Sequence, residues 1–338
     1  LLQSEVKELK CAQSENQVEP ENAYVALEGS EFTIVPETEG SKLKVKEAYK
    51  ALDTAISGSQ TSIDLGSTPD VYAVAAVTSD DPTLQATRDA YNNYTKASIT
   101  YTFGEQTVTL DGSTLKEWLQ FDDKGQLVQD DASFTQHIKD FVAQLASEHD
   151  TVGTTRSFNT TSGRTVSVYG SAYGWKIDQE AETANLIKVI KQGKSVKRKP
   201  EYAHRAKSRK KFDIGNTYVE VSLGEQHMWF YKNGKTLVST DVVTGDISKG
   251  HGTPTGVYYI LYKTTDYTLT GQGYASHVDY WLPFIQIGVG IHDSSWRGSY
   301  GGGIFTYDGS HGCVNTPRSA VQKIYNNIES TYPVVVHW

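Results

Sequence analysis

Cysteine is almost absent from this chain, which has 338 residues and only two cysteines, Cys11 and Cys313. A disulfide scaffold needs more, so packed cores rather than cross-links must stabilise the fold. No run of about 18 apolar residues occurs, which argues against a membrane-spanning helix. The chain begins at Leu1 rather than at Met, so we expect a fragment or a processed product, and any signal segment or anchor would lie upstream.

The composition is that of a folded chain, with 38% hydrophobic and 21% charged residues, and its length predicts two or three domains. The formal charge is −8, yet nine Lys and Arg residues lie between Lys194 and Lys211, with Glu201 as the only acid. Such a run is either a contact for an anionic polymer, such as nucleic acid or teichoic acid, or a solvated interdomain linker. We favour the linker. The acidic remainder argues against a nucleic-acid partner.

The amino-terminal part contains an internal repeat. Its first copy reads as a strand at 32–36, a helix at 48–56 that ends at Gly58, and an extended segment at 61–65. The second copy reads as a strand at 173–177 and a helix at 184–190 that ends at Gly193. Its longer lead-in contains a strand at 98–101 and a helix at 134–145.

This pattern resembles the peptidoglycan-binding α+β repeat found ahead of some cell-wall enzymes. We therefore expect a partial first repeat at 1–87 and a second repeat at 88–206 that ends in the basic linker. The repeats could bind glycan, act as spacers or recruit partners, and the sequence does not choose among these roles.

The remaining residues, 207–338, predict a mainly β domain. Val219, Val221 and Leu223 alternate with polar residues, as in a half-buried strand. Asn233-Gly234 predicts a hairpin turn, because both turn positions need positive φ. Further strands are predicted at 228–231, 236–243, 257–261, 285–291 and 334–336. One prominent helix is predicted near the end, capped by Thr316, with Pro317 at its first position and an apolar face formed by Ala320, Val321, Ile324, Tyr325 and Ile328.

A short window of this domain contains the residues suited to nucleophilic catalysis. Cys313 needs a base or a cation nearby to become a thiolate, and His292 and His311 are candidates. Gly312 permits close backbone approach, so that amides near the sulfur could face an oxyanion. If residues 311–313 are extended, His311 and Cys313 point to one face, and the following helix would favour a thiolate. Cys11 lies in a polar stretch without such partners, and we interpret it as incidental.

Ser310-His311-Gly312-Cys313-Val314-Asn315, preceded by His292 with 17 residues between His292 and Ser310, resembles the signature of the L,D-transpeptidase (YkuD-type) family. Supporting segments lie at 219–221, 243–245 and 253–256, together with Gln226, and the likeness covers residues 212–338. It implies a β-sandwich catalytic domain. Many relatives have Arg where this chain has Asn315, and either side chain could order the loop.

The resemblance implies a bacterial peptidoglycan cross-linking enzyme. Cys313 would attack a tetrapeptide stem at its third residue, release D-Ala and form a thioester, which an amine of a second stem resolves into a 3→3 cross-link. Water would give an L,D-carboxypeptidase side reaction. His292 would act as general base, Asp293 or a backbone carbonyl would orient a histidine, and His311, Ser310, Gly312 and Asn315 would shape the site.

The resemblance also implies covalent inhibition by carbapenems, a monomer without metal or cofactor, and a location in the cell wall or at the outer face of the membrane. Trp296, Tyr300 and Gly301–Gly303 could form a lid over the stem or an ordinary surface loop. We expect Trp281 and Phe284 in the core.

Other interpretations stay open. Cys313 could be a buried small hydrophobe, His292 a structural histidine, and His311 a strand support. A zinc-dependent hydrolase could use His292, Asp293, His311 and Cys313 as ligands, although no HExxH or CxxC spacing occurs. A wall-binding protein with an inactive catalytic domain is the third candidate.

Overall fold

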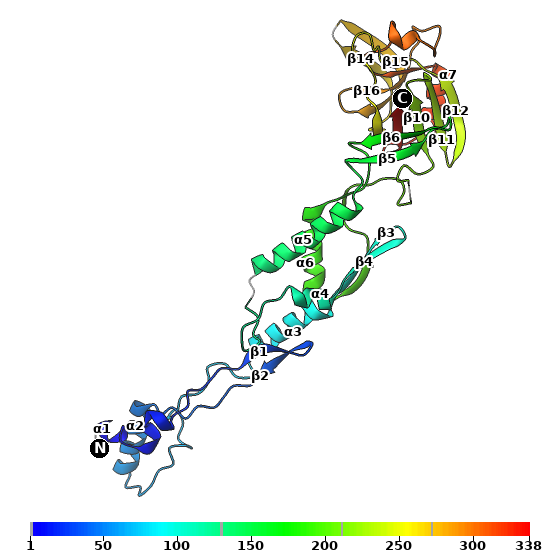
Figure 1. The fold of residues 1–338 in the computed structure, drawn as a ribbon. Coiled ribbons are helices and arrows are strands. Elements are labelled where there is room, and N and C mark those ends of the chain that lie inside the picture. Colours follow the sequence, from blue (N-terminus) through cyan, green and yellow to red (C-terminus); the bar gives the residue numbers. More distant parts are fainter. Residues whose placement is uncertain (1–2, 129–130, 211, 272) are drawn as a thin grey trace. The chain divides into compact units, whose positions relative to one another are not determined.

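The structure is a computed structural model that describes residues 3–128, 131–210, 212–271 and 273–338. The chain forms two compact units (Figure 1). The first contains the residues up to Thr100 together with Thr109–Ile138 and Ala184–Lys197. The second contains Tyr101–Val108, Lys139–Thr183 and Arg198–Trp338. Among the described residues, no helix combines the length and the apolar character needed to cross a bilayer.

The first unit combines short helices with small sheets. Its hairpin pairs β1 with β2 in antiparallel fashion, and Val6, Leu43, Ala48 and Val71 form a buried core with α2. Asp81 caps α3 by accepting from two backbone amides, and Pro82 is the first helical residue. The elements are α1 (Gln3–Val6), η1 (Lys10–Ala12), η2 (Ser14–Asn16), β1 (Tyr24–Glu28), β2 (Glu31–Val35), α2 (Val45–Ser57), α3 (Pro82–Lys96) and α4 (Gly112–Glu117).

Each boundary between the two units falls inside a helix or a strand, and five elements are divided in this way. They are β3 (Ser98–Phe103), β4 (Gln106–Leu110), α5 (Asp131–His149), α6 (Gln179–Lys191) and β8 (Ser195–Arg198), and the strands pair in the order β4-β3-β8. The structure confirms the predicted strand at 98–101 and the helices at 48–56, 134–145 and 184–190.

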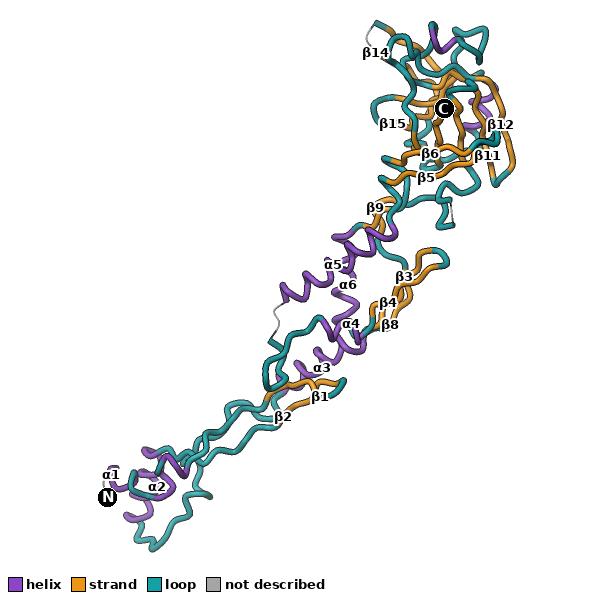
Figure 2. Tube along the Cα trace, viewed as in Figure 1, coloured by secondary structure: helices purple, strands orange, loops and turns teal. Residues whose placement is uncertain are grey.

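The second unit is mainly β, as predicted (Figure 2). A five-stranded sheet has the order β12-β11-β10-β18-β13, and a four-stranded sheet has the order β14-β15-β16-β17. The strands are β10 (Tyr218–Ser222), β11 (His227–Lys232), β12 (Lys235–Asp241), β13 (Gly256–Tyr259), β14 (Thr264–Gly271), β15 (Tyr274–Ile285), β16 (Val289–Asp293), β17 (Val314–Thr316) and β18 (Pro333–His337); η3 (Ile304–Thr306) is a short 3-10 helix. Asn233 and Gly234 both have positive φ in the β11–β12 turn, as predicted.

The two sheets and α7 (Arg318–Tyr325) enclose one buried core. Val219, Phe230 and Val336 come from the first sheet, and Leu282 and Ile291 come from the second. The apolar face of α7 and the residues after it closes the core with Val321, Ile324 and Ile328, which are fully buried. Trp281 and Phe284 are buried as predicted. This sandwich fixes β16 and β17, the strands that carry the catalytic window.

A hairpin formed by β5 (Thr154–Asn159) and β6 (Thr165–Gly170) also belongs to the second unit. Phe158 and Val168 of this hairpin pack with Val257 of β13 and Val335 of β18 in a second buried cluster. Thr161, at the hairpin turn, donates through its backbone N–H (2.9 Å) and its hydroxyl (2.6 Å) to the buried carboxylate of Glu220. The hairpin therefore covers part of the five-stranded sheet.

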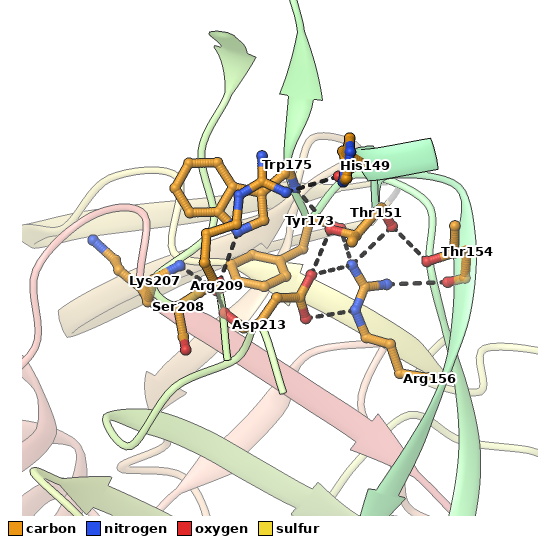
Figure 3. Close-up of polar contacts among 10 residues, drawn as sticks. All are labelled: His149, Thr151, Thr154, Arg156, Tyr173, Trp175, Lys207, Ser208, Arg209 and Asp213. Carbon is orange, nitrogen blue, oxygen red and sulfur yellow. Dashed lines mark hydrogen bonds and ion pairs between the residues drawn. The ribbon is translucent and has the colours of Figure 1, made fainter. Parts of the chain in front are cut away.

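An ion pair ties this hairpin to the start of the catalytic domain (Figure 3). Nε and Nη2 of Arg156 each donate to one oxygen of Asp213 at 2.7 Å. The same guanidinium donates to the carbonyl oxygens of Thr151, Thr154 and Tyr173. Both charged side chains are about nine-tenths buried, with 10% and 8% exposed. We call this group the Arg156–Asp213 clasp.

The prediction that the basic run is a solvated linker is only partly correct for its described part, 194–210, because six of its eight Lys and Arg residues are exposed whereas Arg198 and Arg209 are half-buried. Lys211 lies outside the described residues. The described part includes β8 and β9 (Tyr202–His204), which pairs with β7 (Lys176–Ile177). Arg198 forms an ion pair with the fully buried Glu182. Arg209 lies 4.2 Å from the ring centroid of Trp175 and donates to the carbonyl of His149. These two cations thus pack within the second unit, while the other described cations of the run are exposed.

Three other local predictions are wrong. Residues 61–65 form a loop, in which the carboxylate of Asp64 accepts from the N–H of Gly66 and the hydroxyl of Ser67. Residues 285–291 are the end of β15, a turn and the start of β16, because Gly288 has φ of 90°. Thr316 belongs to β17 and does not cap α7, which begins at Arg318 after Pro317.

Candidate active site

The catalytic window lines a cavity of about 490 Å³ in the second unit. Six of the residues predicted for the site contribute to its wall: His292, Trp296, Ser310, His311, Cys313 and Asn315. Asp293, Tyr300 and Gly312 do not line it. Because β16 and β17 are parallel neighbours, with His292 opposite Asn315, the sheet itself brings the two halves of the window together.

The loop that carries Cys313 is fixed by hydrogen bonds on both sides of the sulfur. Ser310 donates through its hydroxyl to the carbonyl of Cys313 (2.6 Å) and accepts from the N–H of Gly312 (3.0 Å). Thr253 donates to the carbonyl of Gly312 (2.7 Å). Gly312 has φ of 119°, and a Cβ atom there would lie 3.3 Å from Val289. Residues 311–313 are bent rather than extended, so the geometry is set by the glycine.

His292 presents one defined ring nitrogen to its surroundings. The residue is buried in β16, and its Nδ1 lies 2.7 Å from the backbone carbonyl of Asp293, so Nδ1 carries the proton and donates. Nε2 is then left with a lone pair and can accept a proton. Burial lowers the pKa of His292 to about 4, and the nearby cation of Arg297 acts in the same direction, while Asp293 opposes it.

Asp293 orients the histidine through its backbone rather than through its carboxylate. Its side-chain oxygens accept from the N–H groups of Asp279 (3.2 Å) and Tyr280 (2.8 Å) in β15. The carboxylate thereby holds β15 against β16, whereas the carbonyl of the same residue fixes the imidazole tautomer. Of the two possibilities left open by the sequence, the structure shows the carbonyl.

The surroundings of Cys313 favour its protonated form. Burial raises the pKa of Cys313 to about 11, although a hydrogen bond from the backbone N–H of Gly290 acts in the opposite direction. The thiol donates to the carbonyl of Gly288 at 3.5 Å. Among the described residues, neither His292 nor His311 hydrogen-bonds to the sulfur. The raised pKa of Cys313 favours the thiol over the expected thiolate at rest.

Asn315 joins the histidine to a residue that the sequence reading missed. When the amide oxygen of Asn315 faces Arg297, it accepts from Nε (2.6 Å) and Nη2 (3.3 Å), and the amide nitrogen donates to Nε2 of His292 (3.2 Å). Arg297 also donates to the carboxylate (3.1 Å) and the carbonyl (2.6 Å) of Asp308. The only signal in the sequence was a charged residue next to Trp296.

The aromatic residues of the window divide between the cavity and the surrounding loop. His311 stacks on Tyr274, with ring centroids 4.7 Å apart, and is not part of a strand. Trp296 is half exposed, and its ring centroid lies 5.9 Å from that of His292. Tyr300 instead hydrogen-bonds to Ser294 and packs away from the cavity wall. Tyr274 and Tyr307 line the cavity and were not predicted.

A second cavity of about 230 Å³ also reaches Cys313. Its wall comes from β14, β15 and the turn between β15 and β16, and includes Tyr267, Trp281 and Gly288. Tyr274 and Leu269 line both cavities, so β14 and the start of β15 separate them. The sulfur is therefore accessible from two sides.

The zinc alternative required four side chains to converge. Within the described part of the chain, no group of three or more His, Cys, Asp or Glu side chains is arranged to hold a metal ion. Asp293 points to backbone amides of β15, and His311 stacks on Tyr274.

Comparison with known proteins decides the family. Residues 216–336 match the L,D-transpeptidase catalytic domain, and residues 2–64 and 77–197 match the domain described as "Putative peptidoglycan binding domain". A solved structure of a cysteine-to-serine variant of the Enterococcus faecium L,D-transpeptidase is 34% identical, over 74% of this chain and 98% of that chain, with a TM-score of 0.61. The chain belongs to the L,D-transpeptidase family.

A second structure, described as the Ldtfm-avibactam carbamoyl enzyme, is also 34% identical, over 75% of this chain and 99% of that chain, with a TM-score of 0.62. A search of the curated proteins finds no match. Membership in the L,D-transpeptidase family supports a cysteine-dependent acyltransferase that cross-links peptidoglycan, and the peptidoglycan-binding match suggests a cell-wall location.

Proposed function

We propose that this L,D-transpeptidase forms 3→3 cross-links through a thioester on Cys313. The sulfur attacks the carbonyl of the third residue of a tetrapeptide stem, the bond to the terminal D-Ala breaks, and D-Ala leaves with a proton on its amine. An amine of a second stem then attacks the thioester, and the sulfur regains a proton. When water takes the place of the amine, the product is a shortened stem, which is an L,D-carboxypeptidase side activity.

His292 is the general base and acid in this proposal. Its Nε2 receives the proton of Cys313 during the attack and delivers it to the leaving amine. The tautomer supports this role, because Nδ1 donates to the carbonyl of Asp293 and leaves Nε2 as the acceptor. The N–H of Gly290, which reaches the sulfur, is a candidate donor for the oxyanion. Ser310 and Gly312 position the sulfur.

One observation carries the proposal: Cys313 and His292 line one cavity in a chain of this family. The second cavity at the same sulfur supports a reaction with two substrates, because a donor stem and an acceptor amine could approach from different sides. His311, Asn315 and Trp296 would contact the stem from the wall of the larger cavity.

The proposal extends to location and partners. The domains would be 1–87 and 88–206, which bind the wall, and 207–338, which carries out the chemistry as a monomer without a metal or organic cofactor. The site would lie outside the cytoplasmic membrane, at its outer face or in the wall. Because a similar structure is described as a carbamoyl enzyme with avibactam, we expect this cysteine to be acylated by β-lactams such as carbapenems.

Intact-mass spectrometry tests the chemistry directly. The wild type should gain the mass of the acyl group after incubation with a disaccharide-tetrapeptide or a carbapenem, and Cys313→Ala should not. A Cys11→Ala variant is the matched control and should still be acylated, because Cys11 lies in the first unit. Stoichiometric zinc that is lost in Cys313→Ala would favour the hydrolase. Sacculus binding without an adduct in any variant would favour an inactive wall-binding protein.

A further inference from the structure

The contacts of Arg297 show a function that the proposed thioester chemistry does not assign. Its guanidinium is mostly buried, with 9% of the side chain exposed. One edge of it holds Asp308, and the other edge faces the oxygen of the Asn315 amide. A guanidinium has only donors, so whatever it contacts must accept.

This requirement fixes the direction of the Asn315 amide. With its oxygen accepting from Nε and Nη2 of Arg297, its nitrogen necessarily faces Nε2 of His292 at 3.2 Å. The backbone of Asn315 is held in place, because its N–H and carbonyl pair with Val243 (2.9 and 3.0 Å), and its side chain is buried. The amide therefore presents a donor, and never an acceptor, to the imidazole.

The imidazole is thus held between an acceptor and a donor. The carbonyl of Asp293 requires a proton on Nδ1, and the amide nitrogen of Asn315 requires a lone pair on Nε2. Only the neutral Nδ1–H tautomer satisfies both. A protonated Nε2 would face another N–H donor, which is an unfavourable contact.

We propose that Arg297 is a positioning residue that acts through Asn315 to keep Nε2 of His292 a hydrogen-bond acceptor. This inference rests on the proposed role of His292 as the base. It has a consequence for the reaction: the contact of Nε2 with the amide opposes uptake of the thiol proton and favours its release to the departing amine. The Arg297–Asn315 pair would thereby promote proton release as well as ring orientation.

Other charged groups around His292 have to be separated from this effect. On its own strand lies Asp293, which favours the protonated ring. From β17 comes Asn315, from β15 the uncharged ring of Trp281, and the cavity adds Cys313 and His311. Arg297 is the cation that faces the ring, and it disfavours protonation both by its charge and through the amide.

The test is the titration of His292 by NMR, which does not depend on catalysis. In Arg297→Leu the amide is free to turn its oxygen toward Nε2, so we expect the pKa of His292 to rise by about one unit or more. Arg297→Lys keeps the charge but loses the paired N–H donors of the guanidinium, and should raise the pKa of His292 by an intermediate amount. Arg164→Leu is the control: its guanidinium is half exposed, donates to the carbonyl of Trp338 and lies 4.0 Å from Glu225.

A second readout is the ring tautomer. Nitrogen shifts of His292 should report the neutral Nδ1–H form in the wild type and a partly charged form near about pH 5 in Arg297→Leu. A folded Arg297→Leu variant whose titration and tautomer match those of the wild type overturns the inference. Loss of acylation in every protein, with the titration shifted as expected, would instead contradict the proposed thioester chemistry and leave the positioning role in place.

Discussion

Breaking the Arg156–Asp213 clasp should strongly destabilise the catalytic unit. In Arg156→Met the carboxylate of Asp213 stays buried and retains the hydroxyl of Thr151 (2.6 Å) as its side-chain donor. Three carbonyl oxygens, those of Thr151, Thr154 and Tyr173, lose a donor at the same time (Figure 3). Removal of one partner of a buried ion pair costs about 3–5 kcal/mol. We expect a loss of this size.

Urea unfolding followed by tryptophan fluorescence measures the loss. With a slope of about 2–3 kcal/mol per molar urea, the transition of the catalytic unit should move down by about 1–2 M. The matched control is Arg318→Met, which breaks an exposed pair with Asp279 and should cost about 0–1 kcal/mol. A double variant, Arg156→Met with Asp213→Leu, should recover part of the loss because no unpaired charge is left.

Equal urea midpoints of unfolding for Arg156→Met and Arg318→Met would refute the reasoning, because burial would then have no influence on how much an ion pair contributes to stability. A double variant less stable than the sum of its single variants would also contradict it.

Three further predictions concern the site and the sheet behind it. Gly312→Ala should slow acylation at least about tenfold and lower the free energy of unfolding by about 1–3 kcal/mol, because φ of 119° is strained for alanine. Rapid-mixing mass spectrometry measures the acylation rate and urea unfolding measures the stability. An unchanged rate would contradict the role of the turn. The pKa of His292 is about 4 in the folded protein and about 6.5 in the unfolded chain, so unfolding takes up a proton between these pH values. The free energy of unfolding should therefore fall as the pH drops from about 6.5 to 4. Thermal melts of His292→Gln should show a weaker dependence of stability on pH. Thr161→Val should cost about 1–3 kcal/mol by removing a donor from the buried Glu220, whereas the exposed Thr165→Val should be nearly neutral in the same melts.

The sequence predicted the features that depend on local pattern or rare residues. The strand at Val219 and Val221, the Asn233-Gly234 turn and the apolar face of α7 each follow from spacing along the chain. The expectation that this strand is half-buried is wrong, because Glu220 and Ser222 are buried as well. The window around Cys313 was found because a cysteine flanked by Gly and His is uncommon. The helix Pro82–Lys96 was missed, although Asp81 followed by Pro82 is a clear start signal.

What the sequence could not give depends on long-range contacts. Arg297 acts through Asn315, which is 18 positions away in the chain and adjacent only because β16 and β17 pair. The packing of Arg198 and Arg209 was missed because their partners, Glu182 and Trp175, lie earlier in the chain. The protonation of Cys313 and His292 depends on burial, which motif spacing does not report.

The hairpin of β5 and β6 changes where this enzyme can be divided. The family match for the catalytic domain begins at residue 216, yet the apolar face of β13 and β18 around Val257 and Val335 is sealed by residues 158–168. An enzyme truncated at residue 216 would expose this apolar surface to solvent, and the carboxylate of Glu220 would lose its two hydrogen bonds from Thr161. Residues 139–183 are therefore part of the catalytic unit, although they precede the matched catalytic domain in the chain. Exchanges of the amino-terminal repeats between relatives should leave this segment in place.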